Sequence, residues 1–183
     1  MNVTDLIRVK SKKVLKMKGS IEGKINTFTS FYHNSMKEVI KKIIVSSPAF
    51  KNNSKIPSKY TCHGEDMNPQ LDLEGVPTET KSLVLIVDDP DCPIGDWVHW
   101  IVWNIKPNSM IKENNVPGVE GMNDFSKHSY GGPCPPSGTH RYFFKVYALD
   151  TELTLNVHAR KKDLLNAMSG HILAKGELLG LYR

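Results

Sequence analysis

The stretch that decides the fold is SLVLIVDDPDCPIGDWVHWIVWNI, residues 82–105. Its two ends are almost continuously apolar, which is typical of strands that are covered on both faces. Between them, Pro90 cannot extend a central hydrogen-bonded ladder, so the chain must turn there. Consecutive strands are usually neighbours, so we expect the two strands to pair and to bring the acidic turn close to His99. A carboxylate of that turn is then placed to orient the imidazole and to raise its pKa.

The segments around this pair predict a mainly-β chain with one late helix. Candidate strands, rich in β-branched and aromatic residues, are EVIKKIIVSS (38–47), IPSKYT (56–61), QLDLEG (70–75), HRYFFKVYALD (140–150), ELTL (152–155) and GELLGLYR (176–183). Residues 106–140 are rich in Gly, Asn and Pro and are expected to be a long loop, which in a compact domain is usually functional or disordered. ARKKDLLNAMSGH (159–171) has helical apolar spacing, with Gly170 as its stop. We therefore predict a β-sandwich with a peripheral C-terminal helix.

Length and charge divide the chain into an extension and a domain. The 183 residues fit one domain, and the net charge is +5. Residues 1–35 hold seven Lys and Arg against two Asp and Glu, so the whole excess lies there and residues 36–183 are balanced. We expect residues 1–35 to be a mobile basic tail, with a targeting peptide or an arm for an anionic surface as alternatives. The balanced domain gives no case for nucleic acid, and no segment resembles a membrane-spanning helix.

Cysteine usage indicates the compartment. Cys62, Cys92 and Cys134 cannot all pair within one chain, and no secretory signal is evident. A reducing, cytoplasmic setting is therefore expected. The CHGED segment at Cys62–His63 is not a paired metal motif, and a zinc site built from Cys62, His63, Cys134 and a further His is the alternative. No phosphate-loop, dinucleotide or nucleophile-elbow motif occurs in the sequence, so we expect no cofactor.

Three segments carry the residues from which a site could be built. The acidic turn places Asp89 and Asp91 on either side of Pro90, where alternation lets them face the same side; the alternative is a turn whose carboxylates accept backbone N–H bonds. His99 is either a core histidine whose hydrogen bonds are made within the protein, or a residue that contacts a ligand. In YGGPCPPSGTHRYFF, the Pro/Gly loop offers backbone N–H groups to an anion, or is only a rigid turn. His140 and Tyr142 then share one strand face, whereas Arg141 points away and suits a carboxylate partner.

In combination, SLVLIVDDPDCP, WVHWIVWNI, YGGPCPPSGTHRYFFKVYALD and LLNAMSGHILAKGELLGLYR resemble the phosphatidylethanolamine-binding protein family, also called Raf kinase inhibitor-like proteins, in its short bacterial and archaeal branch. IPSKYTCHGEDMNPQL is similar to the family's N-terminal region, so the resemblance covers roughly residues 40–183. It implies a β-sandwich with a small anion pocket at one end. By motif matching, the pocket residues are Asp89, Asp91, Trp97, His99, Gly132, Cys134, Pro135, Pro136, His140 and Tyr142. Cys134 stands where the family commonly has Gly; it is either a small filler or a redox-sensitive thiol in the pocket.

The function that the resemblance implies is a binding module for a small phosphate ester or carboxylate. Two alternatives stay open: an inhibitor of a protein kinase or protease, and a hydrolase or lyase that uses Asp89, His99 and His140 as acid and base. An enzyme is the less favoured reading, because no activated nucleophile is evident. The partners implied are the small ligand, a kinase or protease, and a second copy of the chain, with no metal, nucleic acid or integral membrane segment.

Overall fold

The structure is a computed structural model that describes residues 40–183. The predicted basic tail, residues 1–35, lies outside the described residues, and so does the start of the first predicted strand. The predicted boundary at residue 36 therefore stays a prediction. No helix within residues 40–183 is long and apolar enough to cross a membrane.

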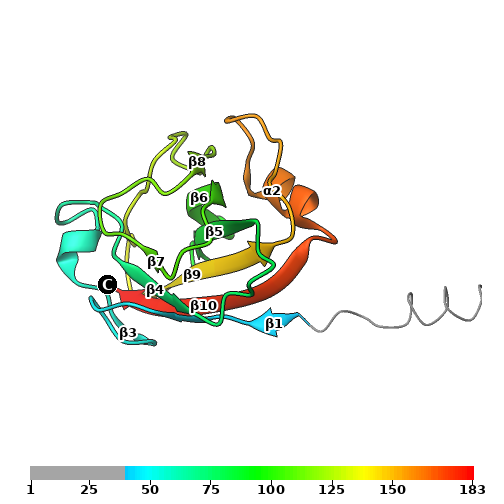
Figure 1. Ribbon diagram of the computed structural model, residues 1–183. Coiled ribbons are helices and arrows are strands. Elements are labelled where there is room, and N and C mark those ends of the chain that lie inside the picture. Colours follow the sequence, from blue (N-terminus) through cyan, green and yellow to red (C-terminus); the bar gives the residue numbers. More distant parts are fainter. Residues whose placement is uncertain (1–39) are drawn as a thin grey trace, which may run out of the picture. The chain divides into compact units, whose positions relative to one another are not determined.

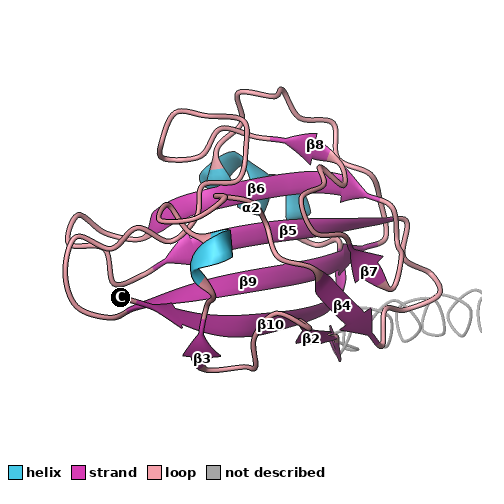
Figure 2. Ribbon diagram, turned by 90° about the vertical axis from the view of Figure 1, so that its left-hand side faces the viewer, coloured by secondary structure: helices cyan, strands magenta, loops and turns pink. Residues whose placement is uncertain are grey.

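Two sheets form the domain, and four long strands make up most of the larger one. The strand order of the large sheet is β1-β10-β9-β5-β6-β8, and β3 pairs with β10 beside this path. Its strands are β1 (Lys41–Lys42), β3 (Ser54–Lys55), β5 (Ser82–Asp89), β6 (Trp97–Ile105), β8 (Val119–Glu120), β9 (His140–Leu149) and β10 (Ile172–Tyr182). The small sheet has the order β2-β4-β7, with β2 (Ile44–Ser46), β4 (Leu71–Glu74) and β7 (Met110–Ile111). Figure 2 shows β6, β5, β9 and β10 side by side, with β4 and β7 in front of them.

Both faces of the large sheet are covered, as its continuous apolar strands require. Alternate residues of β5 and β9 fill a cluster between the sheets, including Leu85, Val87 and Phe144. The residues between them, such as Ile86, form a second cluster with residues of the helix α2 (Lys161–Met168), such as Leu164. Figure 1 shows α2 on the opposite side of the large sheet from β4 and β7. The predicted mainly-β fold with one C-terminal helix is thus confirmed, and Gly170, whose φ is +83°, follows the end of that helix as expected.

Two of the predicted short strands were wrong. The segment IPSKYT forms a 3-10 turn, η1 (Ser58–Tyr60), because the Tyr60 and Thr61 amides donate back to the Pro57 and Ser58 carbonyls. The segment ELTL is not a strand. Its Leu153 backbone exchanges two hydrogen bonds with the Asn104 side chain, at 2.8 and 2.9 Å, in place of a strand partner. The long loop predicted at residues 106–140 is irregular, apart from the two-residue strands β7 and β8 and from His140, which begins β9.

Candidate functional site

A hollow of about 200 Å³ opens where β5 ends and where β6 and β9 begin. Because these strands are antiparallel neighbours, those three strand ends meet at one end of the large sheet. Eight of the ten residues predicted from the sequence line it: Asp89, Trp97, His99, Cys134, Pro135, Pro136, His140 and Tyr142. Cys92, Ile94 and Phe125 also line it and were not predicted.

The base of the hollow contains a buried carboxylate–imidazole pair. The Asp89 carboxylate and the His140 ring are both almost fully buried, and His140 Nδ1 lies 2.7 Å from Asp89 Oδ2. The second carboxylate oxygen, Oδ1, accepts the Asp91 backbone N–H at 2.8 Å. Since Nδ1 donates to the carboxylate, the other ring nitrogen of His140 remains for a ligand. Asp89 therefore plays both roles foreseen for the acidic turn, as a turn-forming acceptor and as a wall of the hollow.

His99 reaches the hollow because β6 carries one extra residue. The pairing of β5 with β6 skips from Val87↔Trp100 to Asp88↔Val98, which leaves His99 without a partner residue. Val98 packs under α2 and Trp100 packs between the sheets, and the His99 ring lies edge-on to Tyr142 on the Trp100 side. Such a β-bulge re-aims a side chain. Strict alternation along the strand could not have predicted this orientation.

The environment of His99 differs from the expectation of a raised pKa. Its Nδ1 lies 2.6 Å from the Gly131 carbonyl oxygen, so a backbone group orients the ring in place of the predicted carboxylate. Burial lowers the pKa of His99, and this outweighs the opposing effects of the Gly131 carbonyl and of Asp89. The ring is neutral at neutral pH. Because Nδ1 donates its proton to Gly131, the other ring nitrogen is an acceptor.

Tyr142 places a buried hydroxyl at the hollow. The residue is 0% exposed, and within residues 40–183 its hydroxyl makes no hydrogen bond of normal length and angle, although the Asp89 carboxylate and the Cys134 backbone lie near it. Burial, followed by the nearby charge of Asp89, raises the pKa of Tyr142, so the hydroxyl stays protonated. A buried polar group without a partner costs free energy, which a ligand oxygen in the hollow would recover.

The proline-rich wall of the hollow is joined to a distant segment. Cys134 forms a disulfide with Cys62, across a sequence separation of 72 residues, and Cys92 is a free thiol. The cysteines thus do not all pair, as predicted, but Cys134 is not the free thiol considered for the pocket. The bridge also removes the two sulfur ligands of the alternative zinc site, and no group of three or more His, Cys, Asp or Glu within residues 40–183 is arranged to hold a metal ion.

Two predicted residues lie outside the lining. The Asp91 carboxylate faces Arg141, accepting from its Nε at 2.9 Å, its Nη2 at 2.8 Å and its backbone N–H at 2.9 Å. Arg141 is therefore the carboxylate partner that the sequence suggested. Gly132 is buried against the segment after η1, where its N–H donates to Asp66 Oδ1 at 2.6 Å. A Cβ atom at Gly132 would lie 2.7 Å from the Thr61 Cα atom, so glycine permits this contact.

The rim of the hollow is apolar and unusually open to solvent. Ile94 is 78% exposed and Phe125 is 38% exposed, and both line the hollow together with Trp97. The Phe125 ring packs edge-on against Trp97 and against His99. Phe125 comes from the long loop, and nothing in the sequence around it marked it as a candidate. A ligand head group that reaches the imidazoles therefore passes through an apolar entrance.

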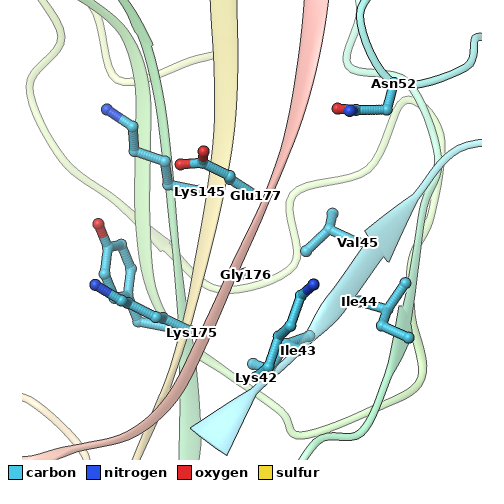
Figure 3. A pocket seen from close by; sticks show the side chains of 10 residues that line it. Lys42, Ile43, Ile44, Val45, Asn52, Lys145, Lys175, Gly176 and Glu177 are labelled. Atoms are coloured by element: carbon cyan, nitrogen blue, oxygen red, sulfur yellow. The ribbon is translucent and has the colours of Figure 1, made fainter. Parts of the chain in front are cut away.

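A second hollow, of about 730 Å³, lies where the chain crosses from the large sheet to the small one. Figure 3 shows Lys145 and Glu177 on one side of it and Asn52 and Val45 on the other. Gly176 allows the crossing, because a Cβ atom there would lie 2.0 Å from the Ile43 carbonyl oxygen. This hollow contains none of the residues predicted for the site. The smaller hollow is therefore the candidate functional site.

Comparisons with known proteins support the family resemblance that the sequence showed. The sequence profile of the phosphatidylethanolamine-binding protein family matches residues 46–183. A UPF0098 protein of Methanothermobacter thermautotrophicus is 52% identical over 143 residues, which cover 74% of this chain and 95% of that protein.

Two solved structures share the fold. A phosphatidylethanolamine-binding protein homologue from Chlamydia trachomatis has a TM-score of 0.75 and 43% identity, covering 78% of this chain and 98% of its own. YbcL of E. coli, described as a new member of the mammalian PEBP family, has a TM-score of 0.72 and 28% identity, with the same coverage of 78% and 98%. Because the family profile spans nearly all of the described residues and the fold is the same, the chain belongs to the phosphatidylethanolamine-binding protein family.

Proposed function

We propose that this protein binds a small phosphate ester or carboxylate in the hollow lined by His99, His140 and Tyr142. The observation that carries the proposal is the buried Tyr142 hydroxyl, which has no partner among the described residues and lines the same hollow as the Asp89-bound His140 ring. The Tyr142 hydroxyl offers a hydrogen bond to a ligand oxygen, and the free Nε2 of His140 accepts one from a neutral ring or donates one from an imidazolium. The negative charge of Asp89 does not oppose this arrangement strongly, since both of its oxygens already accept hydrogen bonds.

The hydrogen-bonding roles favour a ligand that is itself partly protonated. Tyr142 donates, and neutral His99 presents an acceptor nitrogen. A phosphate monoester with one negative charge carries both oxygen acceptors and an O–H donor, so it satisfies both groups at once. A protonated carboxylic acid satisfies them in the same way. A fully ionised, doubly charged phosphate leaves the His99 acceptor unpaired, or requires His99 to take up a proton.

The size of the hollow limits what can enter. About 200 Å³ is smaller than the roughly 300–1,000 Å³ of sites that enclose drug-sized ligands. A phosphate or carboxylate head group fits inside, and the remainder of the ligand lies against the apolar rim of Ile94 and Phe125. That exposed rim also suits a head group carried by a protein partner, which is how an inhibitor of a kinase or protease would use the same hollow.

Isothermal titration calorimetry with phenyl phosphate and with acetate tests the proposal. Tyr142→Phe removes only the hydroxyl and should weaken binding about tenfold, the cost of one hydrogen bond to a charged group. Tyr147→Phe is the matched control, since this tyrosine lies on the same strand and faces away from the hollow. The proposal is wrong if neither ligand binds the parent protein, or if Tyr142→Phe binds as tightly as Tyr147→Phe.

The same samples separate the alternatives. Release of phenol from phenyl phosphate that His140→Ala abolishes would support a hydrolase instead of a binding module. Capture of one purified kinase or protease that free phenyl phosphate prevents would support the inhibitor. Saturable binding without turnover supports the binding module.

A further inference from the structure

We infer that the Cys62–Cys134 disulfide is a reducible clamp on the hollow, and that its reduction loosens the proline-rich wall and weakens anion binding. This inference rests on the proposed function of the same hollow. It concerns regulation of the site, and the residue that controls the wall, Cys62, lies outside the lining.

The bridge joins the wall to a part of the chain that the ligand does not contact. Cys134, Pro135 and Pro136 line the hollow, whereas Cys62 follows the turn η1. The Cα atoms of the two cysteines are 5.5 Å apart, a separation that a disulfide spans without moving the backbone. The position of this wall is therefore linked covalently to a segment 72 residues away in sequence.

The rest of the wall has few other attachments. Before Cys134, Gly131 N donates to the His99 carbonyl at 3.1 Å, Gly132 N donates to Asp66, and Cys62 N donates to the Pro133 carbonyl at 3.2 Å. After Cys134, no hydrogen bond within the described part of the chain involves residues 135–139. Residues 136–139 are exposed. The disulfide is thus the last attachment before β9 begins at His140.

The bridge is open to reagents. Cys62 and Cys134 are both exposed residues, so a small dithiol can reach the sulfur atoms. His63 Nδ1 lies 3.6 Å from Cys62 Sγ, from where an N–H group can donate to a departing thiolate. Attack on Cys134 is therefore the favoured route, with Cys62 as the leaving group.

The chemistry is a two-electron thiol–disulfide exchange with a dithiol as the reductant. One thiolate of the dithiol attacks Cys134 Sγ, the bond between Cys134 and Cys62 breaks, and Cys62 leaves as a thiolate that takes up a proton. The second thiol of the reagent then attacks its own mixed disulfide and releases Cys134, which is protonated in turn. The dithiol ends as a cyclic disulfide, and both cysteines end as thiols.

The redox conditions of the compartment determine whether the disulfide is reduced or oxidised. The reducing cytoplasm expected from the sequence keeps thiols reduced, so there the clamp is open and closes under oxidation. An oxidising compartment keeps it closed. In either setting, the closed form is the one with the ordered wall and the tighter anion site.

The test uses Cys92→Ser as the reference, because the free thiol of Cys92 lines the same hollow and would otherwise exchange. Phenyl phosphate affinity is measured by calorimetry with the bridge intact and after treatment with dithiothreitol. We expect about tenfold weaker binding after reduction, since ordering one backbone residue on binding costs about that factor. Cys62→Ser/Cys92→Ser keeps Cys134 in the wall but lacks the bridge. It should match the reduced reference and not respond to dithiothreitol.

Hydrogen–deuterium exchange provides a readout that needs no ligand. The amides of Cys62, Gly131 and Gly132, which donate hydrogen bonds in the oxidised wall, should exchange faster after reduction, whereas amides within β9 and β10 should not, which also shows that the domain stays folded. If neither the parent nor the oxidised reference binds phenyl phosphate but these amides respond to reduction, the proposed function fails and the clamp stands. Equal affinities and equal exchange of the Cys62, Gly131 and Gly132 amides in both redox states would overturn the clamp.

Discussion

Asp88 and Asp89 are adjacent in the chain, yet their carboxylates lie on opposite faces of the large sheet. Asp89 points between the sheets and accepts from His140, whereas Asp88 points toward α2 and accepts from Lys145 at 2.7 Å and from Lys161 at 2.5 Å. Lys161 also bonds to Asp96, at the far end of the acidic turn. The acidic residues that cluster at this strand end thus each bind basic partners of their own: two lysines, one histidine and one arginine.

Asp88→Asn should destabilise the protein by roughly 2 kcal/mol. Asp88 is 0% exposed, and removing one partner of a buried ion pair leaves the others uncompensated. The lysines are 27% and 19% exposed, so water compensates part of the loss and the effect falls below that of a fully buried pair. Urea unfolding measures the change. Asp96→Asn, at a carboxylate that is 47% exposed, is the control and should cost less than about 1 kcal/mol. Similar losses in the two variants would contradict the assignment.

The free energy of unfolding should fall in mild acid because of His99. Its pKa is lowered from 6.5 by burial, so the unfolded chain binds a proton at a higher pH than the folded chain does. Stability therefore declines as pH falls through about 6.5 and levels off below the folded pKa. Urea unfolding between about pH 8 and pH 5 should show a smaller decline for His99→Gln than for the parent. If the two declines are parallel, the His99 ring is not their source.

Binding of phenyl phosphate should strengthen as pH falls from about 8 to about 6. Its second ionisation lies near pH 6, so a lower pH produces the singly charged form that satisfies both the Tyr142 donor and the His99 acceptor. Phenyl sulfate is the matched control ligand, because it carries one charge and no O–H at any of these pH values. Calorimetry should show a weaker pH dependence for the sulfate. If both ligands respond alike, titration of the protein, and not of the ligand, governs the affinity.

Gly132→Ala should weaken phenyl phosphate binding although Gly132 does not line the hollow. A Cβ atom would lie 2.7 Å from both the Thr61 Cα and the Tyr60 carbonyl oxygen, so the backbone of the wall must shift. Overpacking of this kind costs about 1–3 kcal/mol of stability, measured by urea unfolding. Ser137→Ala, at an exposed position of the same wall, is the control and should change neither property. Binding equal to the parent would show that the wall accommodates the methyl group without moving.

Removing the Cys62–Cys134 disulfide should lower the free energy of unfolding, independently of any effect on ligand binding. Closing a loop of 72 residues restricts the unfolded chain by about 4 kcal/mol on the entropic account. Cys62→Ser should therefore lower the urea midpoint, and dithiothreitol should lower that of the parent to a similar value. Cys92→Ser, which breaks no bridge, serves as the control. A reduced parent that unfolds at the same urea concentration as the oxidised one would contradict this expectation.

The sequence was sufficient for the fold and for most of the lining residues, because both depend on local patterns. Continuous apolar runs identified β5 and β6, and spacing placed His140 and Tyr142 on one face of β9. What could not be predicted depends on long-range register. Alternation suggested that Asp89 and Asp91 share a side, but Arg141 holds Asp91 outside the hollow. Three cysteines without a secretory signal suggested thiols, and only proximity in space pairs Cys62 with Cys134.

Two short segments were wrongly predicted to be strands for a related reason. The Asn104 side chain makes the hydrogen bonds to Leu153 that a strand partner would have made, and the amides of Tyr60 and Thr61 donate to nearby backbone carbonyls in η1. Phe125 and Ile94 escaped notice because nothing in a loop or turn sequence tells which apolar residue folds over a distant histidine.

His99 has no paired residue in β5, so the number of residues in β6 determines where its imidazole lies. If one residue were deleted between Trp97 and Trp100, pairing with β5 would become regular at this end of the strands, and the imidazole would lose the setting that directs it toward the hollow. Composition would hardly change, yet the hydrogen-bond acceptor beside Tyr142 would vanish. A histidine at this position without the additional residue would lie in a different setting, so the number of residues between paired positions matters as much as their identities.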